Sequence, residues 1–186
     1  MLPDPGGRTP APGALRSVQL FVNTLDIENG VDELSSPDAL AVVLERAGVA
    51  EPGLQPGETD LRAALDVREA LRALLLANNG VPVAAEALAP LERASRAGHL
   101  AAAFTSGGSG ELVAEAPGVD GALGRLVAIV VRAAADGSLA RLKACRRDVC
   151  HWVFYDRSRN SGSHWCAMSV CGNRTKTKAY RRRRAA

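Results

Sequence analysis

The sequence predicts a mainly α protein, in which a helical N-terminal domain with one small β-hairpin precedes a small C-terminal metal-binding module. Three observations carry this prediction. Apolar residues recur at helical spacing through much of the first 135 positions. A Ser-Gly-Gly-Ser-Gly turn separates two short apolar stretches, which is typical of a hairpin. All four cysteines lie in the last quarter of the 186-residue chain.

Three segments are predicted along the chain. Residues 1–13 are rich in proline and glycine and are expected to be disordered. Residues 14–138 form the helical domain, and residues 139–184 form the metal module, a β-hairpin followed by a basic helix. Because so small a module lacks a sufficient apolar core, a bound metal would supply about 10 kcal/mol of its folding free energy.

The first helix is predicted over residues 14–26, where apolar side chains fall at helical spacing. Asn23 and Thr24 lie next to this apolar stripe, so they need hydrogen-bond partners if they are buried. We expect Asn23 to fix a neighbouring loop, and the alternative is that the pair contacts a ligand.

The next two helices are predicted from their start signals. Ser36 is a suitable N-cap and Pro37 a suitable first helical residue for a helix that continues over 39–47. Thr59 is predicted to cap a longer helix over 60–78, which an Asn-Gly pair ends.

The second half of the helical domain is predicted to hold two helices and the hairpin. The first of these helices covers 83–97 and bends at Pro90. The hairpin strands are 99–105 and 111–116, and the strongly apolar last helix covers 119–135.

The cysteines form two C-x4-C pairs, Cys145 with Cys150 and Cys166 with Cys171, separated by fifteen residues. Each pair can converge on one ion, and the intervening stretch is long enough to turn a hairpin between them. Zn²⁺ prefers a tetrahedron of soft ligands, which thiolates supply. The pattern therefore predicts one structural zinc ion held by these four residues.

Other uses of the cysteines remain as alternatives. Two disulfides would need an oxidising compartment, whereas the N-terminal sequence shows no secretory signal, so we expect a cytoplasmic protein with reduced thiols. An iron–sulfur cluster also takes four thiolates. His151 or His164 could replace one cysteine, but surface or phosphate contacts are the expected roles of both.

Charge is divided unevenly along the chain. Residues 141–186 hold thirteen Lys and Arg and two Asp, a formal charge of +11, whereas residues 1–140 carry −8. This asymmetry favours a polyanionic partner for the module. The rings of Trp152, Phe154 and Trp165 are predicted to build a small core around the metal rather than a base-stacking platform.

Several function classes lack support in the sequence. No apolar run approaches the ~20 residues of a membrane span, so no membrane partner is expected. A glycine-rich phosphate loop, an H-E-x-x-H motif and a nucleophile elbow are all missing from the sequence. Catalytic zinc normally keeps an open coordination position, which four cysteines would fill. We therefore do not expect an enzyme.

The segment CHWVFYDRSRNSGSHWCAMSVCGNR closely resembles the CGNR zinc-finger family. The matching elements are the two C-x4-C pairs, the block from Trp152 to Asn160, the Trp165-Cys166 pair and Cys171-Gly172-Asn173-Arg174. Residues 162–164 depart from the basic residues common there in the family. The opening FVNTLDIENG and the helical order resemble the ABATE domain that is joined to such fingers. The resemblance implies a stress-induced transcription regulator that binds DNA.

A basic helix is expected to begin near Arg174, after a tight turn at Gly172 and Asn173, and to enter the major groove of duplex DNA. The predicted nucleic-acid-binding residues are Asn173, Arg174, Lys176, Lys178, Arg181, Arg182, Arg157 and Arg159. An alternative is that a structural zinc module binds RNA or a protein. A homodimer through the 119–135 helix and an unidentified small-molecule ligand of the helical domain are hypotheses for further partners.

Overall fold

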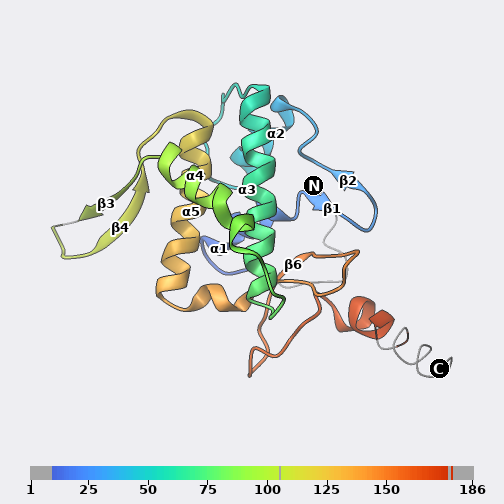
Figure 1. Ribbon diagram of the computed structural model, residues 1–186. Coiled ribbons are helices and arrows are strands. Elements are labelled where there is room, and N and C mark those ends of the chain that lie inside the picture. Colours follow the sequence, from blue (N-terminus) through green and yellow to red (C-terminus); the bar gives the residue numbers. More distant parts are fainter. Residues whose placement is uncertain (1–9, 105, 176, 178–186) are drawn as a thin grey trace.

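Two long helices, α3 and α5, form the middle of the molecule, and the other helices pack around them (Figure 1). The computed structural model describes residues 10–104, 106–175 and 177. Its α-helices are α1 (Leu15–Val22), α2 (Pro37–Arg46), α3 (Glu58–Ala77), α4 (Ala89–Ala97) and α5 (Gly118–Ala135). We call the part from α1 to the 3-10 turn η2 (Ser138–Arg141) the helical body. The mainly α class is confirmed.

Helix α1 is shorter than the sequence predicts, because the chain leaves the helix at Asn23. The next residues form strand β1 (Leu25–Asp26), which pairs antiparallel with β2 (Val31–Asp32). The Thr24 hydroxyl donates to the Phe21 carbonyl over 2.8 Å, and the Thr24 carbonyl accepts the backbone N–H of Glu33. These bonds fix the turn out of the helix.

Helix α2 begins as predicted, with the Ser36 hydroxyl accepting the backbone N–H of Ala39 over 3.2 Å. The predicted cap of α3 is wrong. The helix begins after Gly57, whose backbone N–H is bound by the Asp60 carboxylate over 2.7 Å, so Thr59 already lies within the first turn.

The predicted helix over 83–97 is divided into a 3-10 turn, η1 (Ala85–Leu88), and α4, with Pro90 in the first turn of α4. Helix α4 then packs against α5 at two glycines. A Cβ added to Gly98 would lie 2.8 Å from the Cα of Gly124, so larger residues would separate the helices.

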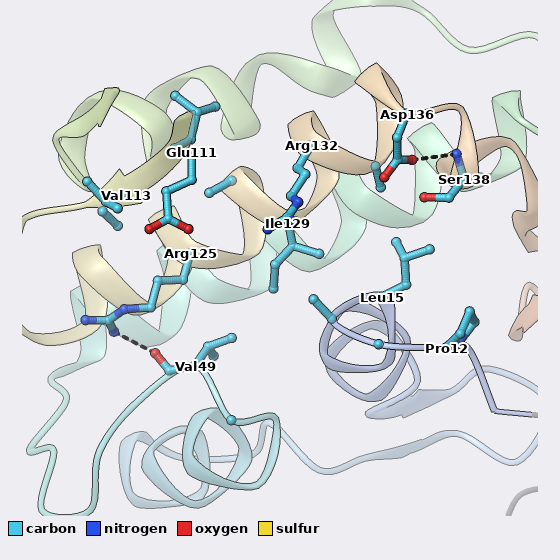
Figure 2. Close-up of a pocket in the computed structure, with 17 residues that line it drawn as sticks. Pro12, Leu15, Val49, Glu111, Val113, Arg125, Ile129, Arg132, Asp136 and Ser138 are labelled. Carbon is cyan, nitrogen blue, oxygen red and sulfur yellow. Dashed lines mark hydrogen bonds between the residues drawn. The ribbon is translucent and has the colours of Figure 1, made fainter. Parts of the chain in front are cut away.

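The predicted hairpin is confirmed as β3 (Leu100–Phe104) and β4 (Gly110–Ala114), with Leu100 opposite Ala114. It projects from the helical body in Figure 1, and the Phe104 side chain near its tip is 82% exposed. Helix α5 packs on β4, and a groove lies between β4, α5 and the start of α1 (Figure 2).

A third hairpin joins the helical body to the cysteines. Strand β5 (Leu142–Ala144) pairs antiparallel with β6 (Val153–Tyr155). One face of this hairpin, with Leu142, Ala144 and Val153, belongs to the main apolar core. Phe154 faces a second cluster, which contains the four cysteines. We call the part from β5 onward the cysteine module.

Helix α5 owes its apolar character to burial within this chain. Its buried residues pack against α1, α3 and α4, so a dimer is not needed to explain them. No helix in the described part of the chain is long and apolar enough to cross a membrane.

Candidate metal centre and the adjoining basic surface

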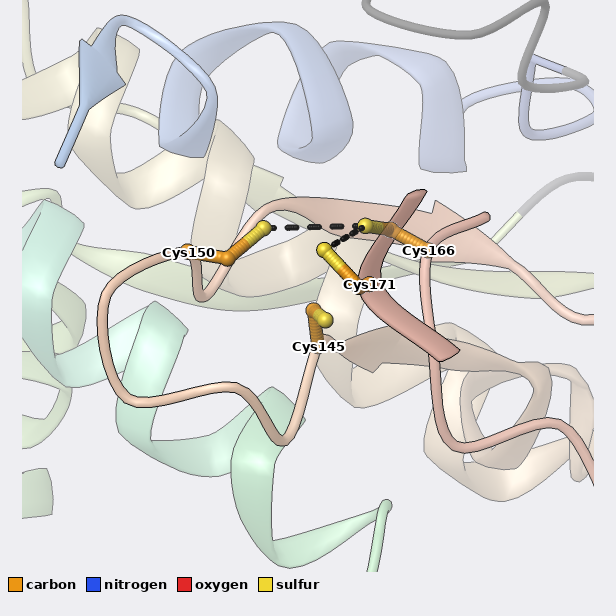
Figure 3. Close-up of side chains that lie close together, drawn as sticks. All are labelled: Cys145, Cys150, Cys166 and Cys171. Atoms are coloured by element: carbon orange, nitrogen blue, oxygen red, sulfur yellow. Dashed lines mark hydrogen bonds between the residues drawn. The ribbon is translucent and has the colours of Figure 1, made fainter. Parts of the chain in front are cut away.

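The four cysteine sulfurs converge on one point (Figure 3). They all lie within 4.8 Å of one another, and all four side chains are buried. The Sγ of Cys166 is 3.6 Å from that of Cys150 and 3.5 Å from that of Cys171. Four sulfurs around one Zn²⁺ at 2.3 Å would be separated by about 3.8 Å, so the arrangement has the dimensions of a tetrahedral metal site.

The same distances do not fit disulfides. An S–S bond is about 2.05 Å long, far shorter than the separations of these sulfurs. Cys145, Cys150, Cys166 and Cys171 are free thiols in the structure. The arrangement favours a shared ion over paired bridges.

The thiols strongly affect one another's protonation. Hydrogen bonds from Cys150 and Cys166 lower the pKa of Cys145 to about 4. The same hydrogen bonds raise the pKa of Cys150 and Cys166, which favours their protonated forms, and burial raises both pKa values further. Without a cation, ionising one thiol therefore opposes ionising its neighbours, and a divalent metal would remove that opposition.

Short backbone turns hold the cysteines. The N–H of Cys145 donates to the Trp152 carbonyl over 3.0 Å, and that of Cys150 donates to Arg147 over 2.8 Å. Cys171 lies in a π-helical turn, η3 (Met168–Gly172), and its N–H donates to Ala167 over 3.0 Å. The two C-x4-C segments are thus local turns, as their spacing suggests.

The predicted tight turn at Gly172 and Asn173 is wrong. Asn173 has φ −65° and ψ −41°, which is ordinary right-handed helix, and the chain continues helically through residue 175. Gly172 lies in a crowded place, because an added Cβ would lie 3.2 Å from the Trp165 ring and the end of the flexible, exposed Met168 side chain would have to move away.

Aromatic side chains enclose the sulfurs. Trp152 and Phe154 are buried in the cysteine cluster, and partly buried Trp165 and Val170 pack against it. The predicted role of these three rings in a miniature core is confirmed. Their burial keeps water from the sulfurs, which strengthens any electrostatic interaction there.

The helical body binds the module through α1. The Asn23 amide pairs with the backbone of Val153, accepting its N–H over 2.8 Å and donating to its carbonyl over 2.9 Å. Buried Gln19 donates to the same carbonyl over 3.2 Å. Asn23 therefore fixes a strand 130 residues away, rather than the neighbouring loop that the sequence predicts.

The C-terminal end of α3 holds the module from another side. Asn79 donates to the carbonyls of Ala144 and His164, over 2.8 and 2.9 Å, and its own carbonyl accepts from Arg146 over 2.5 Å. The His164 ring also contacts the Asn79 amide oxygen over 2.9 Å. His164 is thus partly exposed with a partner in the helical body, and its predicted contact with phosphate stays a prediction.

A buried ion pair organises the loop between the two cysteine pairs. Lys143 Nζ lies 2.8 Å from an Asp156 carboxylate oxygen, and both side chains are almost fully buried. Asp156 also accepts the backbone N–H groups of Ser158 and Ser163, each over 2.9 Å. Lys143 donates to the Ser161 carbonyl over 2.5 Å. The pair therefore replaces backbone hydrogen bonds that an irregular loop would leave unmade.

Two arginines beside the cysteines share a carboxylate of the helical body. Glu28, in the turn between β1 and β2, places one oxygen 2.8 Å from Arg147 and the other 2.5 Å from Arg174. These arginines and Arg146 line a hollow of about 270 Å³, together with Trp165 and Thr175. We call Arg146, Arg147 and Arg174 the arginine surface.

The predicted nucleic-acid residues are only partly gathered here. Arg174 belongs to the arginine surface, and both Arg174 and its neighbour Asn173 are exposed. Arg157 and Arg159 are exposed in the loop after β6, where Arg157 stacks 5.9 Å from the Tyr155 ring and donates to the Pro10 carbonyl over 3.4 Å. Lys176, Lys178, Arg181 and Arg182 lie outside the described residues.

Several residues that hold the site are not indicated by any sequence pattern. No motif predicts a role for Glu28, Arg72 or Asn78, although Arg72 donates to the His151 carbonyl and Asn78 to those of Leu139 and Leu142. For Asn79 the sequence predicts only a helix end. The available signal was three amide side chains, Asn23, Asn78 and Asn79, at the ends of apolar helices.

Two family models match the chain along its length. The model described as ABATE, Putative stress-induced transcription regulator, matches residues 15–140, and the model described as CGNR zinc finger matches residues 141–184. The two matched regions correspond to the helical body and the cysteine module. No curated protein shows significant sequence similarity to the chain.

Proposed function

The chain belongs to the ABATE family, whose model is described as Putative stress-induced transcription regulator, and a CGNR zinc finger follows that domain. We propose that the protein is a zinc-dependent DNA-binding regulator. In this proposal the cysteine module contacts duplex DNA, and the helical body orients the module and serves sensing or dimerisation.

The convergence of four buried sulfurs is the observation that supports zinc. Cys145, Cys150, Cys166 and Cys171 offer only soft donors at tetrahedral separations, which suits Zn²⁺. One ion held by four protein ligands has no open position, so its role in the proposal is structural. Metal analysis of the purified protein should give one zinc per chain, and iron with the visible absorption of a cluster would contradict this.

The arginine surface supports the choice of a polyanion. Glu28 already binds Arg147 and Arg174 through two different carboxylate oxygens, so the two guanidinium groups can hold one anion between them. A phosphate group offers the same geometry with more charge. Arg174 also lies in the helical segment after Cys171, so the metal would fix the direction in which that segment leaves the module.

Among the other predicted contacts, Asn173 is proposed to reach a base edge, whereas Arg174 holds a phosphate together with Arg147, and Arg157 and Arg159 contact the flanking phosphates. Lys176, Lys178, Arg181 and Arg182, which lie outside the described residues, are proposed to add further phosphate contacts. Binding would then weaken steeply with salt, by roughly 10³-fold between 50 and 200 mM if six or more phosphates are engaged.

The test is a salt series of duplex binding by the zinc-loaded full chain, with a chelated sample beside it. Arg174→Gln should weaken binding and reduce the slope of log K against log salt by about 1. Arg96→Gln is the matched control, because Arg96 is an exposed arginine on α4 that pairs only weakly with Glu92. Binding that ignores chelation, or that prefers single strands, would contradict the proposal and favour an RNA or protein partner.

A further inference from the structure

A groove of about 790 Å³ lies on the helical body, away from the cysteines (Figure 2). Its walls come from four places in the chain: the start of α1, the loop after α2, strand β4 and one face of α5. A volume of this size accommodates a small organic molecule.

The interior of the groove is apolar. Leu15 and Val49 are buried beside it, and Ile129 lies between them and strand β4 in Figure 2. Ala128 and Ala133 are small, so α5 leaves room for a ligand rather than filling the groove. Such a surface would bind the hydrocarbon part of a ligand by removing it from water.

Arg132 gives the groove an anchor for an anion. It lies with Ile129 in the middle of the groove, between Arg125 at one end and Asp136 at the other (Figure 2). Within the described residues the Arg132 guanidinium forms no ion pair or hydrogen bond, although its charge attracts the nearby Asp136 carboxylate. Arg125, in contrast, already donates to the Val49 carbonyl over 2.7 Å. A ligand carboxylate would give the Arg132 guanidinium a partner.

The two acidic residues of the groove restrict that anion to a single charge. Glu111 lies at the Arg125 end, and the Asp136 carboxylate lies at the other end, where it accepts the Ser138 N–H over 2.8 Å. A molecule with an acidic group at each end would meet one of these carboxylates and be repelled.

We propose that this groove binds a small amphipathic monoanion, with its carboxylate on Arg132 and its apolar chain against Leu15, Val49 and Ile129. This names the class of ligand for the sensing role proposed above. The biological use of the ligand rests on that proposed function. Binding itself is independent of DNA.

The experiment is titration calorimetry of the metal-loaded full chain with octanoate, octan-1-ol and octanedioate, without nucleic acid. Octanoate should bind at one site per chain, about 10-fold or more tighter than the alcohol or the diacid, because only the monoanion gains a charged hydrogen bond to Arg132 without repulsion at the other end. Arg132→Gln should remove the preference for octanoate over octanol. Arg96→Gln, with an exposed arginine outside the groove, should keep it.

Equal binding of octanoate and octanol would overturn the choice of an anion, and so would an unchanged preference in Arg132→Gln. No binding of any of the three would overturn the site. Because DNA is absent, each of these results leaves the DNA-binding proposal untouched, and loss of DNA binding would leave this one standing.

Discussion

The helical body and the cysteine module are stabilised in different ways. The body buries a continuous set of aliphatic side chains from all five α-helices and the inner face of the β5–β6 hairpin. The module buries four thiols and a few rings, and its backbone runs mostly through turns. A fold with little regular structure needs other hydrogen-bond partners for its buried backbone N–H and C=O groups, and here side chains of the helical body supply some of them.

This difference shows that the helical body and the cysteine module depend on each other for their structure. Asn23 and Asn79 belong to the body, yet their amides bind only backbone or side-chain groups of the module. The body supplies hydrogen bonds that the module cannot make within itself. The module in turn covers the apolar residues of the body with Leu142 and Val153.

Removing a metal ligand should have the largest effect and would separate the two kinds of stabilisation. In Cys171→Ser we expect loss of tight zinc binding, which is worth about 10 kcal/mol in small zinc modules. Amide exchange should accelerate in the module, whereas the helical circular dichroism signal should remain. The melting temperature should still fall, because the hairpin is part of the main core. Ser169→Ala, at an exposed neighbour, is the control; protected module amides in Cys171→Ser would refute the idea.

Neutralising Asp156 should have the next largest effect. Burial alone would raise the pKa of Asp156, but hydrogen bonds from Lys143, Ser158 and Ser163 hold it well below its ordinary value. Its contribution is therefore complete above about pH 4 and is lost only as the pH falls further. At pH 7, Asp156→Asn should cost about 3–5 kcal/mol, because Lys143 is left buried without its partner. Urea unfolding against exposed Asp148→Asn measures this; equal stabilities of the two variants would count against a structural ion pair.

Cutting the link between the regions should have a smaller effect. Asn23→Ala removes two hydrogen bonds to Val153 and leaves its N–H buried, which should cost about 2 kcal/mol. Exchange of the β5–β6 amides should accelerate more than exchange in α3. Asn29→Ala is the control, because exposed Asn29 bonds only to nearby Asp26. An unfolding free energy equal to that of the control would show that the link contributes nothing.

The smallest effect concerns the charged contact between the regions. Glu28→Gln should change stability by less than about 1 kcal/mol, since exposed ion pairs contribute little. It should nevertheless increase duplex affinity several-fold, because Arg147 and Arg174 are freed for phosphate. Glu45→Gln, an exposed glutamate on α2, removes the same charge elsewhere. If both variants gain affinity equally, only net charge matters and the local competition is disproved.

The sequence predicted local features better than distant ones. The Ser36 cap, the β3–β4 hairpin and α5 follow from short patterns, and the cysteine spacing predicted where the four sulfurs meet. Those features depend on residues close together in the chain. The predicted end of α1 was wrong because the Asn23 side chain binds the backbone of Val153. Helical periodicity cannot reveal a partner 130 residues away.

The same limit applies to the candidate site. The roles of Glu28 and Asn79 follow from where α3 and the β1–β2 turn bring them, not from their neighbours in sequence. Gly172 shows a different failure: glycine suggested an unusual backbone, whereas the chain is helical there and the Trp165 and Met168 side chains pack where a Cβ would lie. From the sequence alone, a glycine that leaves space for its neighbours cannot be told from a glycine that adopts a positive φ.

The pairing of α1 with β6 also has a consequence for synthesis on the ribosome. Asn23 leaves the ribosome long before Val153, which follows 130 residues later. Until then, Gln19, Asn23 and Arg72 lack their module partners, and the aliphatic side chains that Leu142 and Val153 will cover stay open to water. Such surfaces invite association between nascent chains. The strand that binds the end of the first helix is thus made 130 residues after it, so a chain truncated before β6 would be a target for chaperones and proteases.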